Sequence, residues 1–453
     1  MKTPIVDFVR GYAQKNSVRL HMPGHKGNSC LGFEVFDITE IDGADVLYSP
    51  DGIILESENN ASRLFGTAHT YYSTEGSTLC IKAMLAIATA DRGGGRPLVF
   101  ATRNSHKAFI YAAALLDFDV EWLYPSEFSH LCACDVTPSQ LETALQECKR
   151  KPCAVYVTSP DYLGNILDIK GLADVCHAHG VPLLVDNAHG AYLNFLREPL
   201  HPIALGADMC CDSAHKTLPV LTGGAYLHVS ENANGDYTQI AREKLSLFAS
   251  TSPSYLILQS LDLCNAYLCD CYFERLSALC DRLTRMKNRL SESGFCICGS
   301  EPLKLTLDAS KSGFSGKSLS EYLSACGIEI EFSDRDCAVM MFTPENSEDD
   351  ISHVERALLS FDLSKEGDQA LSDAELCTLH SALCTHIRVM SIHDAIFSRS
   401  ELISTEDAEG RICALPCVSC PPAVPVIISG ERIEQGHIEL LKYYGTEQIS
   451  VVK

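Results

Sequence analysis

Two stretches of the sequence, VPLLVDNAHG at residues 181–190 and ADMCCDSAHKT at residues 207–217, determine the fold class that we expect for this chain. Each contains a short apolar run, which is typical of a buried strand, and continues directly into polar residues. The first run ends at Asp186, and the second leads into Lys216. Because ligands bind at the carboxyl ends of parallel strands, this spacing predicts a carboxylate and an amine at one edge of a sheet.

A strand-end carboxylate followed by a strand-end lysine is the arrangement that pyridoxal phosphate (PLP) requires. The lysine amine forms a Schiff base with the cofactor aldehyde, and the carboxylate keeps the pyridine nitrogen protonated so that the ring accepts electrons. Ser213 and His215 are suitable donors for the cofactor phosphate. Taken singly, each residue has a plainer interpretation, because lysines are mostly solvated, Asp commonly forms turns and a histidine can be structural. The combination predicts a PLP site built on Asp186 and Lys216.

The overall composition limits the class of protein. The chain has 453 residues, of which 46% are hydrophobic and 21% charged, which is typical of a globular protein with two or three domains. Its formal net charge of -23 argues against nucleic acid as a partner, because phosphate contacts need clustered Lys and Arg. The acidic surface either attracts cationic small molecules weakly or serves solubility alone.

The 22 cysteines raise the question of disulfides or a metal. Residues 1–4 lead into no apolar signal region, and the sequence has no apolar run of ~18 residues, so we expect a cytoplasmic protein with reduced thiols and no membrane partner. Only Cys417 and Cys420 have CxxC spacing, and no second pair completes a zinc site. The sequence therefore predicts cysteines that act as small apolar residues, and no metal.

The apolar and helical patterns predict the domain organisation. We expect an N-terminal helix and arm at residues 1–45, a PLP-binding major domain at residues 46–292 and a small C-terminal α/β domain at residues 293–453. In the major domain, short apolar runs that alternate with helical patterns predict a mostly parallel sheet. Residues 255–292 predict one long helix, and the region after it predicts a βαβ-type unit.

Three further positions are candidates for cofactor contacts. Gly76-Ser77-Thr78 precedes an apolar helix, where hydroxyls and the first helical N–H groups hold an anion, although a plain helix cap is the competing interpretation. His106 follows the apolar run PLVFAT, where its ring either stacks on the cofactor or lies in a loop. His189 either lies near the cofactor or packs beneath the sheet.

In these motifs the chain resembles the bacterial ornithine/lysine/arginine decarboxylase family, in its short form without an N-terminal wing domain. The matching segments span nearly the whole chain and are HMPGHKG at 21–27, DITEIDGADVLYSPDGII at 37–54, FGTAHTYYSTEGST at 65–78, RNSHKA at 103–108, VDNAHGAYL at 185–193, GADMCCDSAHKTLPVLTG at 206–223, STSPSYLILQSLD at 250–262 and CPPAVPVIISGERI at 420–433. The resemblance implies an α/β, aspartate aminotransferase-like fold (PLP fold type I), with a mostly parallel sheet in the large domain and a smaller α+β C-terminal domain.

The resemblance also implies a role for each candidate residue. Lys216 is expected to carry PLP, Asp186 to pair with the pyridine nitrogen and His106 to stack on the ring. The implied phosphate ligands are Ser77, Thr78, Ser213 and His215. Thr251 and Ser252 are expected to approach the cofactor of a neighbouring subunit, which implies a homodimer or a larger assembly of dimers.

The implied reaction is decarboxylation of a basic amino acid to its amine, with Lys216 or His215 as the proton donor to Cα. Three departures from the family pattern leave arginine, lysine and ornithine open as substrates: Glu75 replaces Asn, Thr222-Gly223-Gly224 stands where Gln is common, and Ala423 replaces Gly.

Two alternatives remain. A PLP-dependent aminotransferase or lyase is one, because Arg388 and Arg432 are available to hold a substrate carboxylate. A non-catalytic PLP-binding protein is the other; its sign would be a missing cofactor ligand, and all expected ligands are present.

Overall fold

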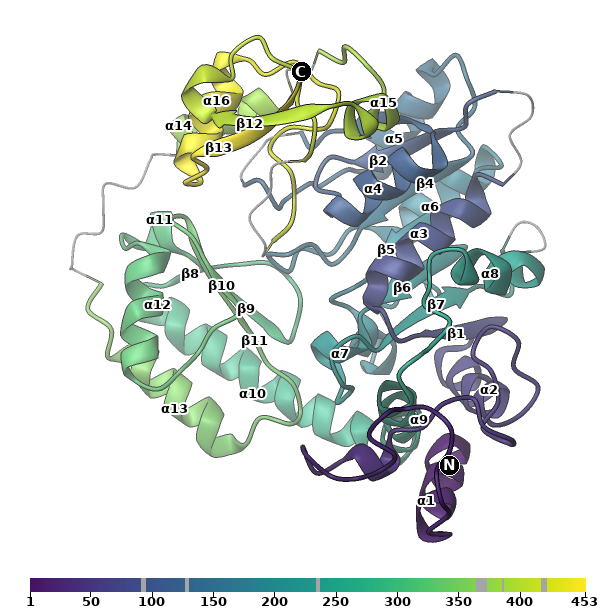
Figure 1. Cartoon of the computed structure of the whole chain (residues 1–453). Helices are drawn as coiled ribbons and strands as arrows, with labels where there is room; N and C mark the ends of the chain where they lie inside the picture. The colour runs from purple at the N-terminus through teal and green to yellow at the C-terminus, as the bar shows by residue number, and fades with distance from the viewer. Residues whose placement is uncertain (91–94, 127–129, 234–236, 364–372, 385–386, 417–421) are drawn as a thin grey trace. The chain divides into compact units, whose positions relative to one another are not determined.

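The computed structural model describes residues 1–453 except 91–94, 127–129, 234–236, 364–372, 385–386 and 417–421 (Figure 1). The paired cysteines Cys417 and Cys420 lie outside the described residues. The chain divides into two compact units. The first contains Met1–Asp91 and Ile169–Ser277, and the second contains Arg92–Asp168 and Ala278–Lys453.

The first unit carries the two sequence stretches with Asp186 and Lys216. Its helices are α1 (Pro4–Gln14), η1 (Glu34–Phe36), α2 (Ile53–Phe65), α3 (Gly76–Ala88), α6 (Ile169–Ala178), η2 (Ala191–Phe195), α7 (Ala214–Thr217), α8 (Tyr237–Ser246) and α9 (Tyr255–Asp270). Its strands are β1 (His69–Ser73), β5 (Leu183–Asp186), β6 (Met209–Asp212) and β7 (Ala225–Val229). The expected N-terminal helix is confirmed as α1, and the expected strands at both stretches are confirmed as β5 and β6.

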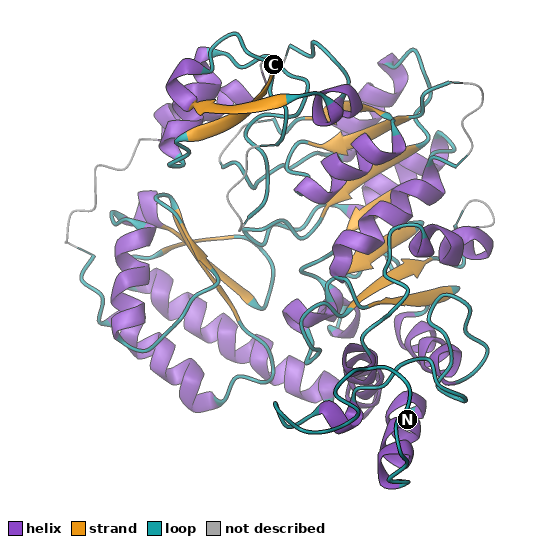
Figure 2. Cartoon of the chain, viewed as in Figure 1, coloured by secondary structure: helices purple, strands orange, loops and turns teal. Residues whose placement is uncertain are grey.

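The second unit combines strands of the large sheet with a smaller sheet and several helices (Figure 2). Its strands are β2 (Leu98–Thr102), β3 (Asp119–Leu123), β4 (Ala154–Thr158), β8 (Cys296–Cys298), β9 (Lys304–Asp308), β10 (Phe332–Ser333), β11 (Cys337–Met341), β12 (Ser400–Ser404) and β13 (Gln448–Val452). Its helices are α4 (Lys107–Leu116), α5 (Pro138–Glu147), α11 (Ala309–Ser312), α12 (Gly316–Ala325), α13 (Glu348–Leu359), α14 (Asp373–His380), η3 (Ser381–Cys384), α15 (Ile392–Phe397), η4 (Thr405–Asp407) and α16 (Gln435–Tyr443), and α10 (Tyr272–Glu292) crosses the boundary between the units.

The large sheet has seven strands in the order β1-β7-β6-β5-β4-β2-β3. Pairing is parallel for β5–β6, β2–β4 and β2–β3, and antiparallel for β1–β7 and β6–β7. The mostly parallel sheet expected from the sequence is therefore confirmed. Every residue of β2, β5, β6 and β7 is buried, which explains why these strands read as continuous apolar runs.

The predicted single helix at residues 255–292 is wrong. Helix α9 ends at Asp270 and α10 begins at Tyr272, because Cys271 leaves the helical region with φ -133° and ψ 4°. The fully buried Tyr272 ring packs against Phe195 and Tyr267, with ring centroids 5.6 Å and 5.4 Å apart. We infer that this tertiary packing determines where the helix breaks, since no Pro or Gly marks the position.

The predicted βαβ-type unit after residue 293 is also wrong. The smaller sheet has the order β10-β11-β9-β8, and all of its strand pairs are antiparallel. Strands β10 and β11 form a hairpin, because Asp334 Oδ1 in the turn between them accepts hydrogen bonds of 2.8 Å from the backbone N–H groups of Asp336 and Cys337. This local turn folds β11 back beside β10, which a helical crossover would not do.

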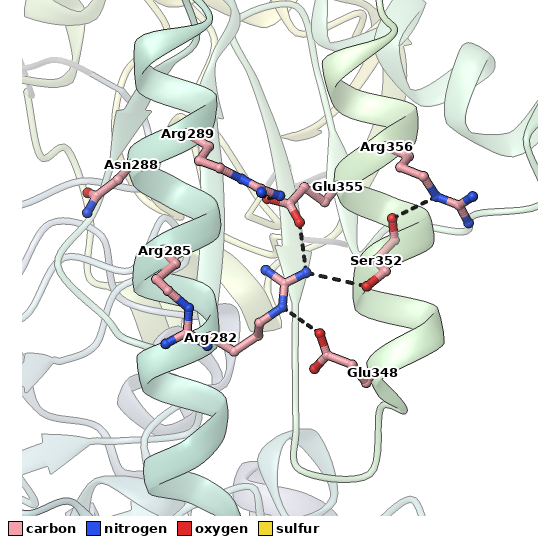
Figure 3. A pocket seen from close by; sticks show the side chains of 8 residues that line it. All are labelled: Arg282, Arg285, Asn288, Arg289, Glu348, Ser352, Glu355 and Arg356. Carbon is pink, nitrogen blue, oxygen red and sulfur yellow. Dashed lines mark hydrogen bonds and ion pairs between the residues drawn. The ribbon is translucent and has the colours of Figure 1, made fainter.

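Helices α10 and α13 are joined by ion pairs in a polar pocket (Figure 3). Arg282 donates to Glu348 and to Glu355, at 2.7 Å in both cases, and Arg289 also donates to Glu355. Burial raises the pKa of Glu355, but its bonds to the two arginines outweigh this and lower it. Arg285 and Arg356 lie on opposite sides of this network in Figure 3, so these guanidinium groups do not converge on a ligand position.

None of the helices in the described residues combines the length and the apolar character that crossing a bilayer requires. No disulfide joins the cysteines of the described residues, and many of these cysteines are buried, as expected for small apolar side chains.

Candidate active site

The structure brings the two sequence stretches together at the ends of β5 and β6. Ser213 follows β6 and is the N-cap of the short helix α7. The backbone N–H of Lys216 in this helix donates to the Ser213 carbonyl at 2.9 Å. The Lys216 Nζ atom lies 3.1 Å from Nε2 of His189, and His189 belongs to the turn that follows β5. His189 is buried, and it lies near the lysine amine rather than away from it beneath the sheet.

Asp186 is buried at the last position of β5. In the parallel pairing of β5 with β6 its partner is Cys211. Its Oδ1 accepts from the backbone N–H of Ala188 at 3.2 Å and from the Cys211 thiol at 3.7 Å. These donors orient the carboxylate at the carboxyl end of the strand, on the same face of the sheet as Cys211.

The hydroxyl groups proposed for a phosphate also meet. Ser213 Oγ donates to Ser77 Oγ at 2.7 Å, which places the first turn of α3 beside the start of α7. Gly76 precedes Ser77 with φ +71°, and its N–H donates to the Gly223 carbonyl at 2.7 Å. Thr78 lies in the same turn and is exposed. Hydroxyls and free helical N–H groups at the start of a 13-residue helix suit an anion.

His215 has a defined proton arrangement. Its Nδ1 lies 2.9 Å from the Gly224 carbonyl, which can only accept, so Nδ1 carries a proton. Burial lowers the pKa of His215, and the nearby Lys216 lowers it further, so the neutral ring presents Nε2 as an acceptor. Protonation would convert Nε2 into a donor toward a phosphate or a carbanion.

Three predicted residues are not among these contacts. His106 belongs to the second unit, where it caps α4 and its Nδ1 accepts from the Ala108 N–H at 3.1 Å. Thr251 and Ser252 are exposed in the loop before α9. That loop starts beside α3, because Ser250 N–H donates to Glu75 Oε1 at 2.6 Å.

Both glycines of the TGG segment lie close to neighbouring atoms, of the backbone at Gly223 and of a side chain at Gly224. A Cβ on Gly223, which has φ +97°, would lie 2.9 Å from the Thr74 carbonyl oxygen. A Cβ on Gly224 would lie 2.3 Å from the Val220 side chain. This segment therefore packs where no larger side chain fits.

Ala423, which replaces a family glycine, has a left-handed backbone with φ +59°. We predict that Ala423→Gly raises the free energy of unfolding by about 0.5–1 kcal/mol, because relief of the left-handed strain outweighs the entropy that glycine loses on folding. Chemical denaturation measures the change. Ala414→Gly, a buried alanine without positive φ, is the matched control and is expected to lose stability. A loss of stability in both variants would contradict the prediction.

Several residues of this region had no recognisable signal in the sequence. Asn187 donates to Asp212 at 2.6 Å, and Asp212 also meets His201 and His228. His201 lies in the loop between the two stretches, and no sequence pattern around it identified it as a partner of Asp212. His228 is a polar residue inside the apolar run AYLHV, which was the one available sign.

The α/β architecture and the mostly parallel sheet define an aspartate aminotransferase-like fold. The chain is similar over 100% of its length to the crystal structure of the Francisella novicida lysine decarboxylase LdcF, with a TM-score of 0.81, 15% identity and 81% of that chain covered. Lysine decarboxylase A from Pseudomonas aeruginosa gives a TM-score of 0.80 at 16% identity, with 99% of this chain and 80% of that chain covered.

The chain belongs to the Orn/Lys/Arg decarboxylase family. The family model for the major domain matches residues 3–294, and that for the C-terminal domain matches residues 388–449. The uncharacterized protein YaaO of Bacillus subtilis is 30% identical, with 97% of this chain and 94% of the relative covered. The arginine decarboxylase of Bacillus subtilis is 28% identical, with 97% and 93% covered. The resemblance seen in the sequence motifs is thus confirmed.

Proposed function

We propose that this protein is a PLP-dependent decarboxylase of a basic amino acid. The observation that carries the proposal is that the two stretches 181–190 and 207–217 lie in contact. Lys216 Nζ lies 3.1 Å from His189, which belongs to the turn after Asp186, and the chain is a member of the Orn/Lys/Arg decarboxylase family. Arginine is the first substrate to test, because a relative at 28% identity is named arginine decarboxylase. Lysine and ornithine are the other two candidates, and the product is the corresponding diamine or polyamine.

The donor set of the site fits PLP. A buried carboxylate at a strand end, a primary amine on the next segment and paired hydroxyls at a helix start correspond to its pyridine nitrogen, its aldehyde and its phosphate. Lys216 would hold the aldehyde and Asp186 the pyridine nitrogen. The phosphate would be held by Gly76, Ser77, Thr78, Ser213 and His215. His106 would stack on the ring, and His189 would contact it.

PLP supplies, when bound, an electron sink for the carbanion that remains after loss of CO2. The chain supplies the charges and protons around it. Asp186 is buried at the end of β5, and a carboxylate there would favour a protonated partner opposite it. We propose that one of two groups returns a proton to Cα: the Lys216 amine, which contacts His189, or His215, whose Nε2 becomes a donor on protonation.

The aminotransferase alternative is less well supported. A clamp for a substrate carboxylate would need an arginine at the carboxyl ends of the strands. Arg388 instead lies 3.6 Å from Asp119, the first residue of β3, at the amino end of that strand. Arg432 is exposed, and its backbone pairs with Ile387. Neither observation favours a role for these arginines at Lys216.

We propose that the protein forms a homodimer, or an assembly of dimers, with shared active sites. Several large apolar side chains of the N-terminal arm are exposed, among them Val18 at 86%, Leu20 at 91% and Leu31 at 76%. A group of exposed apolar residues is typical of a surface that another chain covers. Thr251 and Ser252 are exposed as well, so they are available to a neighbouring subunit.

Mixing of two inactive variants tests the shared site. Lys216→Ala subunits and Thr251→Ala/Ser252→Ala subunits are each expected to be impaired. At equal amounts, exchange between them should restore about a quarter of wild-type activity, because about half of the dimers are hybrids and one of the two sites in each hybrid is intact. Mixing Lys216→Ala with Asp186→Asn is the control and should restore nothing, since both changes affect the same half. Activity that stays at the level of the separate variants, or a monomer in sedimentation, would contradict the shared site.

Three further expectations remain part of the proposal. The domains of the protein are proposed to be residues 1–45, 46–292 and 293–453. The proposed location is the cytoplasm, and the proposed partners include neither nucleic acid nor membrane.

A further inference from the structure

Asp212, the last residue of β6, lies on the face of the sheet opposite to Asp186. Side chains alternate between the two faces of a strand. Cys211 points toward Asp186, with its thiol 3.7 Å from Asp186 Oδ1, so the adjacent Asp212 points the other way. Its side chain is completely buried. A carboxylate in such a place is stable only when several donors satisfy it.

Three donors converge on the Asp212 carboxylate. Oδ1 accepts from Asn187 Nδ2 at 2.6 Å, and Oδ2 lies 3.1 Å from His201 Nε2 and 3.0 Å from His228 Nε2. Both imidazole rings are completely buried, and the Phe65 ring packs against them, with centroids 5.4 Å and 4.5 Å away. The donors come from the turn after β5, from the loop after η2 and from β7.

The protons of this cluster can be assigned by elimination. An ionised carboxylate only accepts, so both Nε2 atoms carry hydrogen. Burial lowers the pKa of His228, so the ring is neutral and its Nδ1 accepts from Thr70 Oγ1 at 2.9 Å. Burial raises the pKa of Asp212, but the two histidines outweigh this and keep it below its usual range. The cluster is therefore a buried carboxylate that accepts from one amide N–H and two imidazole N–H groups.

The donors connect Asp212 to both segments of the candidate active site. Along the chain, Asp212 is followed by Ser213, which bonds Ser77, and by the helix that carries Lys216. Through space, it holds Asn187, which lies directly after Asp186. The Asn187 side chain lies close against Gly190, because a Cβ at that position would lie 2.0 Å from Asn187 Oδ1.

We infer that Asp212 is a positioning residue, whose buried carboxylate fixes the segment of Asp186 and His189 relative to that of Lys216 by way of Asn187. The inference rests on the proposed function, because positioning matters only if Asp186 and Lys216 share a cofactor. The competing interpretation is a divalent metal site, since Cys210 Sγ lies 3.9 Å from His201 Nε2 and all four side chains could ligate. The hydrogen-bonded arrangement is favoured because it accounts for the contacts of 3.1 Å and 3.0 Å between Asp212 Oδ2 and the two Nε2 atoms without a metal.

A double-mutant cycle tests the inference, with Asn187→Ala, Asp212→Asn and the double variant. Each single change is expected to weaken PLP binding at least ~10-fold and to lower kcat at least ~10-fold, with KM changed less than ~3-fold. The double variant should be little worse than either single variant, because both changes break the same link. PLP affinity is measured by titrating the apoprotein, and the urea midpoint of the apoprotein reports folding.

Asn265→Ala is the matched control, because Asn265 is also completely buried and donates its amide to Ser57 and Tyr72, outside the candidate active site. It should lower the urea midpoint as Asn187→Ala does, yet leave PLP affinity within ~2-fold of wild type. Equal losses of PLP affinity in both variants, or additive losses in the cycle, would overturn the inference. If Asp212→Asn does not fold, the comparison of Asn187→Ala with Asn265→Ala decides the question.

Metal content separates the competing site. The purified wild-type protein is expected to hold less than ~0.1 equivalent of zinc or other transition metal by mass spectrometry. About one equivalent, lost in Asp212→Asn, would overturn the inference in favour of a metal. Failure of the proposed function is distinguishable: a protein that binds PLP but releases no CO2 from basic amino acids refutes the decarboxylase, while the PLP affinities of the cycle still measure positioning.

Discussion

Replacing Lys216 with alanine is expected to abolish decarboxylation and the covalent attachment of PLP. No other amine among the predicted site residues is placed to form the Schiff base, so the loss in kcat should be at least about a thousand-fold. After borohydride reduction, mass spectrometry should find one PLP per wild-type chain and none on the variant. The yellow absorbance of the wild-type holoprotein should be lost or shifted.

Lys170→Ala serves as the control, because this exposed lysine pairs with Asp174 on the surface of α6. It should keep both the adduct and the activity. A Lys216→Ala protein that still carries one PLP per chain on another lysine after reduction would show that the lysine was assigned wrongly.

Asp186→Asn is expected to retain some PLP yet to lose several powers of ten in kcat. A neutral amide cannot hold the proton on the pyridine nitrogen, so the ring no longer accepts electrons from the carbanion. The shape of the side chain is conserved, and the protein should therefore fold. Steady-state turnover together with the PLP content of the purified variant measures the effect.

Asp208→Asn is the matched control, since Asp208 is a buried carboxylate of the same unit that accepts from Leu183 N–H and His177. It should lose stability and keep the turnover of the folded fraction. Turnover near the wild-type value in Asp186→Asn would refute the role of Asp186.

The Asp186 and Lys216 pair could be predicted because its signals are local. Asp186 directly follows one apolar run, Lys216 stands a few residues after the next, and the ends of neighbouring parallel strands meet. His189 was ambiguous in the sequence, and only the fold of the turn places it 3.1 Å from Lys216 Nζ. The mostly parallel sheet was predictable for the same reason, since buried strands are short apolar runs between helices.

The features that escaped prediction depend on contacts between distant residues. The Asp212 cluster forms because the register of β6 against β7 pairs Cys210 with His228, and because a loop brings His201 to the same face of the sheet as Asp212. The break at Cys271 comes from the packing of Tyr272, and no helix-breaking residue precedes it. The β10–β11 hairpin depends on the turn that Asp334 makes, and the sequence before Asp334 did not indicate this turn. The contacts of His106, Thr251 and Ser252 with a cofactor stay predictions.

Incubation of the PLP-loaded protein with arginine, lysine and ornithine, separately, tests the central claim most directly. Released CO2 and the amine product are measured together over time. The account predicts that at least one of the three substrates yields CO2 and its amine in equal amounts, with Lys216→Ala inactive under the same conditions. Keto acid formed without CO2, or no product from any of the three, would contradict it.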